Sequence, residues 1–129
     1  MNLLEDRVLV RNTTIAVVML TCICGLLGYR FTTKTSLERE RVRARTTLET
    51  IHQLQLAYHH EYGTYLSSDR GNTSDVLRWD DMPGKFQYVV LGHGDTYVAI
   101  AEADFDGDGD YEVWRVDPRH PDPVLVQSD

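Results

Sequence analysis

The chain has 129 residues, 42% of them hydrophobic, which allows one modest core and excludes a second large domain. Residues 1–60 hold eight Lys or Arg against five acids, a balance of +3, whereas residues 61–129 hold five against fifteen, a balance of −10. A strongly acidic second half repels nucleic acid and attracts divalent cations, so nucleic acid is excluded as a partner.

An uncharged apolar run lies near the start of the chain. Residues 15–29 read IAVVMLTCICGLLGY, and Thr13 and Thr14 extend the run to 17 residues, the short end of what spans a hydrocarbon core. A cleaved secretory signal is the competing interpretation, but the residues after Cys24 lack a clear small-x-small cleavage site. We therefore predict a transmembrane or filament-core helix over residues 1–34.

The pattern becomes amphipathic over residues 35–63. No Gly or Pro occurs between Gly28 and Gly63, so the helix is predicted to continue without a break. Gly63 is placed to end it, because glycine readily adopts the left-handed conformation of a helix C-terminus. The predicted stripe at steps of three and four comprises Leu37, Arg41, Ala44, Leu48, Ile51, Leu54, Gln55, Ala57, Tyr58 and Tyr62.

The remaining chain reads as a connector followed by strands. Residues 64–84 are rich in Ser, Asp, Asn and Gly, with one helical turn predicted at DVLRW. From residue 85 the period changes to two, and short runs rich in Val, Tyr, Phe and Trp alternate with turn residues. Residues 85–129 are therefore predicted to form three or four antiparallel strands whose apolar face packs on the helix stripe, an α+β fold.

One loop of the predicted sheet, residues 104–112, carries an acid at every second position. With Asp104 as position 1, Gly109 stands at position 6, where calcium loops turn sharply. Position 12 is Arg115, so the bidentate Glu of an EF-hand is missing. The loop is closer to the DxDxDGxxD/E loop of FG-GAP repeats, which it resembles.

Hard oxygen ligands without His or Cys favour Ca²⁺ over zinc or copper, and a flexible cage of six to eight oxygens favours it over magnesium. The alternative is an Asp-Gly turn that binds nothing, since Asp and Gly are ordinary turn residues. The predicted side-chain ligands are Asp104, Asp106, Asp108 and Glu112, and Asp110 is predicted to contribute its backbone carbonyl.

No enzyme is predicted. The five histidines show no HExxH spacing, and neither a Gly-x-Ser-x-Gly motif nor a P-loop is present. His52 and His59 lie seven residues apart on one helix face, where a packing or solvated role is favoured over a metal site that lacks a third ligand.

The chain resembles the type IV pilin and type II secretion pseudopilin superfamily in the order of its parts. An apolar helix comes first, followed by its amphipathic continuation, a connector and a small antiparallel sheet. The most specific part is YHHEYGTY at residues 58–65, which is similar to the Tyr and Gly cluster where the pilin helix ends. The resemblance covers nearly the whole chain as architecture.

This resemblance implies a subunit that is inserted in the cytoplasmic membrane before assembly. Pilus or secretion assembly machinery would then polymerise it with its own copies, through the N-terminal helix, into an extracellular filament. The alternatives are a pseudopilin of a secretion system and a membrane-anchored calcium-binding module that does not polymerise.

The N-terminus departs from the family pattern, because no basic leader ending in Gly is present. If Met1 is the mature first residue, MNLLE looks like the start of a mature pilin, and the resemblance implies that Glu5 neutralises a neighbour's N-terminal amine. Asp6 and Arg7 would then lie in the apolar core, where each is expensive unless paired. The alternative is a retained or atypically processed leader, with Glu5 solvated.

Overall fold

The computed structural model describes the backbone of residues 3–79 and 84–129, and the side chains from residue 18 onward except those of residues 31, 33 and 80–83. The chain divides into two compact units, Met1–Glu38 and Arg39–Asp129. The elements are α1 (Leu3–Tyr62), α2 (Thr73–Leu77), β1 (Gln87–His93), β2 (Thr96–Ala103), β3 (Glu112–Asp117) and β4 (His120–Gln127).

Helix α1 is continuous over 60 residues, which confirms the single helix predicted from the absence of Gly and Pro after Gly28. It ends where predicted. Gly63 has φ +73°, and its N–H donates to the carbonyl of His59 at 2.8 Å. This bond satisfies one of the carbonyls that a helix C-terminus leaves free.

The first unit contains the apolar run, and its described large apolar side chains are exposed, from 51% for Ile23 to 69% for Tyr29. The sequence predicted a membrane span here. Among the residues that the structure describes, however, no helix is both long and apolar enough to cross a membrane. The side chain of Glu5 lies outside the described residues.

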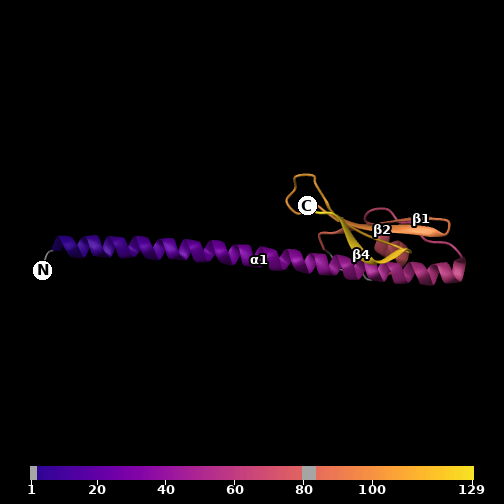
Figure 1. Ribbon diagram of the computed structural model, residues 1–129, viewed down its shortest axis with the longest axis horizontal. Coiled ribbons are helices and arrows are strands. Elements are labelled where there is room, and N and C mark those ends of the chain that lie inside the picture. The colour runs from indigo at the N-terminus through magenta and orange to yellow at the C-terminus, as the bar shows by residue number, and fades with distance from the viewer. Residues whose placement is uncertain (1–2, 80–83) are drawn as a thin grey trace. The chain divides into compact units, whose positions relative to one another are not determined.

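The second unit contains a four-stranded sheet in the order β1-β2-β3-β4, with each strand antiparallel to the next (Figure 1). This arrangement confirms the predicted antiparallel meander and the α+β class. Figure 1 shows the sheet lying against the C-terminal part of α1. The helical turn predicted at residues 75–79 lies two residues earlier as α2, because Arg78 ends it in a left-handed conformation.

The core lies between α1 and one face of the sheet. Along β2 the buried positions alternate, so Tyr97 and three alanines face the same way. The alanines are short, so the sheet can pack closely against the helix. The buried apolar residues are Ala44, Leu48, Ile51, Leu77, Phe86, Tyr88, Val90, Tyr97, Ala99, Ala101, Ala103 and Val116.

The connector covers the outer edge of β1. The backbones of Ser68 and Val90 bond to each other in both directions, and the side chain of Gln55 from α1 bonds to both the N–H and the C=O of Leu66. A Cβ on Gly92 would lie 2.9 Å from the carbonyl oxygens of Tyr65 and Leu66, so only glycine fits there without a shift. These contacts fix the connector against the sheet.

Candidate metal site

The loop between β2 and β3 folds around its own carboxylates. The carboxylate of Asp104 accepts bonds from the N–H groups of Gly107 at 2.7 Å and Gly109 at 3.1 Å. Both glycines have positive φ, +82° and +94°, which L-residues rarely adopt. The N–H of Asp108 donates to Asp106, so successive carboxylates face the inside of the loop.

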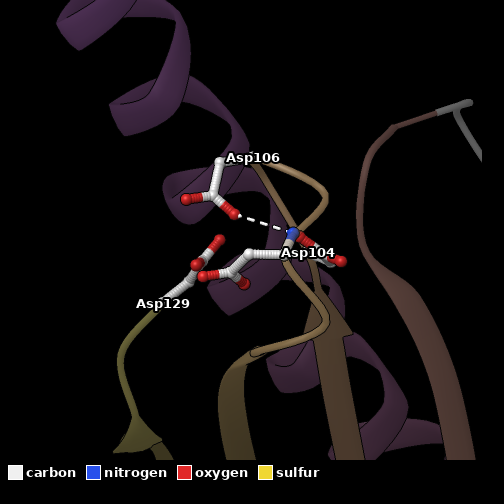
Figure 2. Close-up of side chains that lie close together, drawn as sticks. Asp104, Asp106 and Asp129 are labelled. Carbon is white, nitrogen blue, oxygen red and sulfur yellow. Dashed lines mark hydrogen bonds between the residues drawn. The ribbon is translucent and has the colours of Figure 1, made fainter.

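A fourth carboxylate comes from beyond β4. The Oδ2 of Asp129 accepts a bond from the N–H of Phe105 at 2.7 Å, which draws residue 129 to the loop. Asp104, Asp106, Asp108 and Asp129 each offer an oxygen, and these oxygens lie within 4.8 Å of one another. Figure 2 shows the carboxylates of Asp104, Asp106 and Asp129 turned toward each other. The cluster could hold a metal ion.

The charges in the cluster oppose one another. The N–H of Asp108 lowers the pKa of Asp106, but partial desolvation and the charges of Asp108 and Asp129 outweigh it and raise that pKa above its ordinary value. Mutual repulsion of this kind is relieved by a bound cation.

The structure does not bring Glu112, a predicted ligand, into the cluster. Glu112 opens β3 opposite Ala103, on the sheet face that packs against α1, and its side chain is fully buried. Arg41 of α1 holds its carboxylate with Nη2 at 2.6 Å and Nε at 2.9 Å, and the indole N–H of Trp114 donates at 2.8 Å. Asp110 lies exposed in the loop, where its N–H donates to Asp108.

Burial favours the neutral form of Glu112, but the bonds from Arg41 and Trp114 and the charge of Arg41 together hold its pKa below the ordinary value. Glu112 is therefore an ionised anchor between β3 and α1, placed next to the aspartate loop. The sequence did not predict Asp129 as a ligand. Asp129 lies 25 residues after Asp104, and only the folding of the β3–β4 hairpin brings it back to the loop, so no local pattern marks it.

The chain matches no protein-family model, no curated protein and no solved structure.

The two histidines on one helix face have separate partners. His52 is buried and its Nδ1 bonds to the hydroxyl of Tyr97. His59 stacks on Tyr65 with ring centroids 4.4 Å apart. Both rings thus pack against the rest of the second unit.

Proposed function

We propose that this chain is a structural subunit of an extracellular filament of the type IV class, in which copies pack through the N-terminal half of α1. One observation carries the proposal. Within a single helix, Ala44, Leu48 and Ile51 are completely buried, whereas the described apolar residues between Val18 and Tyr29 are more than half exposed. Exposed apolar surface of this extent marks an interaction site.

Copies of the same helix are the partners that the sequence favours. A repeated subunit presents the same apolar stretch at every contact, and a contact that does not close on itself builds a helical polymer. The resemblance of the architecture to pilins points the same way. A pseudopilin shares these features and differs in the length of the polymer it forms.

We further propose that the ion bound by the aspartate cluster is Ca²⁺, held by Asp104, Asp106, Asp108 and Asp129. Four carboxylates without His or Cys suit a hard cation, and a flexible oxygen cage favours calcium over magnesium, which demands near-octahedral geometry. The ion would tie the β2–β3 loop to residue 129. At about 1 mM free calcium, a Kd of about 0.1 mM would add about 1.4 kcal/mol to the free energy of unfolding.

The proposed function is tested on cells that make the protein. The surface is sheared, and the pelleted fraction is examined by electron microscopy and intact mass. Thin regular filaments composed of this chain are expected, and a mass beginning at Met1 would assign Glu5 the role of assembly residue. Protein that stays in the detergent-soluble membrane fraction without filaments would contradict the proposal and favour the anchored module.

A matched pair of variants separates assembly from folding. Leu26→Asp places a charge in the exposed apolar stretch and should abolish the filaments, because a buried unpaired carboxylate is costly. Lys34→Gln changes an exposed charge on the same helix and should leave them intact. Both variants should unfold at the wild-type temperature, since neither touches the second unit's core.

A further inference from the structure

A groove of about 410 Å³ lies between α1 and the start of β4. Its α1 wall includes Glu49, His52 and Gln53, and its β4 wall is Pro121 with Asp122. None of these residues belongs to the aspartate cluster, and the filament proposal does not use them.

The groove carries two uncompensated negative charges. Glu49 stands on the helix wall and Asp122 on the strand wall, and both are exposed. Within the described part of the chain, no ion pair or hydrogen bond engages either side chain. Two carboxylates on opposite walls form an electrostatic site for a cation.

His52 contributes a donor to the same groove. Tyr97 is fully buried, and burial raises its pKa, so the phenol keeps its proton. A buried hydroxyl proton needs an acceptor, and among the described residues the hydroxyl contacts only His52 Nδ1, so we assign the hydroxyl as donor to that nitrogen. With Nδ1 accepting, the ring proton of His52 lies on Nε2, and this N–H is left for the groove that the ring lines.

The matching ligand is a planar cation next to a hydrogen-bond acceptor. A guanidinium has five donors and bridges two carboxylates better than an ammonium does, and the backbone carbonyl beside it can accept from His52. An arginine within a peptide chain combines both groups.

The chain itself supplies a suitable arginine. Arg41 is held by Glu112, Arg43 by Glu40, and Arg45 lies over the Trp114 ring at 5.7 Å. Arg39 is exposed and has no partner among the described residues. Residues 1–60 are net positive and residues 61–129 strongly negative, so the helical half of one copy attracts the acidic half of another.

We propose that the groove binds the guanidinium of Arg39 from a neighbouring copy, between Glu49 and Asp122. This inference rests on the proposed filament, because it needs a second copy. Arg39 and Glu49 are ten residues apart on α1, so parallel copies joined this way are offset by about 15 Å along the helix.

The contact is tested by sedimentation velocity of the full chain over a range of concentrations. Arg39→Gln should weaken self-association at least tenfold, and so should the double variant Glu49→Gln with Asp122→Asn. Combining all three should cost little more, because they remove one contact. Lys34→Gln is the matched control and should change nothing. Unchanged association in the Arg39 and groove variants overturns the inference and leaves the filament proposal standing.

The chemistry of the groove is tested separately with N-acetyl-arginine amide, using the ¹⁵N signals of the His52 ring in the full chain. A saturable shift of Nε2 is expected, and the neutral isostere N-acetyl-citrulline amide should produce none. An equal response to both probes, or none to either, overturns the guanidinium assignment. If the arginine probe binds but the wild-type chain never associates, the second-copy assignment and the filament proposal both fail.

Discussion

Arg41 of α1 and Glu112 of β3 are 71 residues apart in the chain, yet they form a charge-assisted pair at 2.6 Å with Glu112 completely buried. The pair fixes the strand that follows the aspartate loop to the helix. It gives the loop a rigid base at Glu112, while Asp106, Asp108 and Asp110 remain exposed.

Replacing Arg41 with Gln should lower the free energy of unfolding by about 3–5 kcal/mol, because it leaves a buried carboxylate without its counter-charge. Urea unfolding measures the loss. Arg43→Gln breaks a half-exposed pair with Glu40 and should cost less than about 1 kcal/mol. Equal losses in the two variants would show that the buried Arg41–Glu112 pair stabilises the fold no more than an exposed pair does.

The same pair predicts how stability depends on pH. Because the pKa of Glu112 is lowered in the folded state, the stabilisation is complete above the ordinary Glu value of about 4.3 and is lost as the pH falls through the lowered value. Melting temperature measured from pH 7 to pH 3 should therefore fall in the acid range.

Glu112→Gln should reduce this acid dependence without removing it. The remaining acid dependence comes from Asp117. Burial tends to raise the pKa of Asp117, but the N–H groups of His120 and Arg119 outweigh it and lower that pKa below its ordinary value. An acid slope in Glu112→Gln identical to that of the wild type would contradict the assigned role of Glu112.

Calcium should raise the melting temperature of the wild-type chain, and Asp106→Asn, Asp108→Asn and Asp129→Asn should each remove that rise. Asp110→Asn is the matched control, because Asp110 lies in the same loop but outside the cluster. If calcium still raises the melting temperature of Asp129→Asn, Asp129 is not a ligand and the ligands all come from the loop. The pKa of Asp106 is raised. As the pH falls, the affinity for calcium should therefore begin to weaken at a higher pH than the ordinary pKa of Asp would predict.

Gly92→Ala should lower the free energy of unfolding by about 1–3 kcal/mol, because the new methyl group would meet two backbone carbonyl oxygens at 2.9 Å. Leu91→Ala, at an exposed neighbouring position, should change it far less. Chemical denaturation of both variants gives the comparison, and a neutral Gly92→Ala would mean that the connector can move away from β1.

The sequence alone determined the elements of this protein. Apolar steps of three and four marked the helix up to Tyr62, alternation marked three or four strands, and Gly63 marked the end of the helix, because each of these signals is local. The aspartates at 104, 106 and 108 were equally visible, since a loop that folds around its own carboxylates needs only neighbours in sequence.

The tertiary structure decided which distant residues meet. Strand register turned Glu112 toward Arg41, the β3–β4 hairpin brought Asp129 to the loop, and packing of α1 on β2 joined His52 to Tyr97. No local pattern encodes these pairings. They depend on which face of a strand meets the helix, and that choice follows from burying the whole apolar face of the sheet at once.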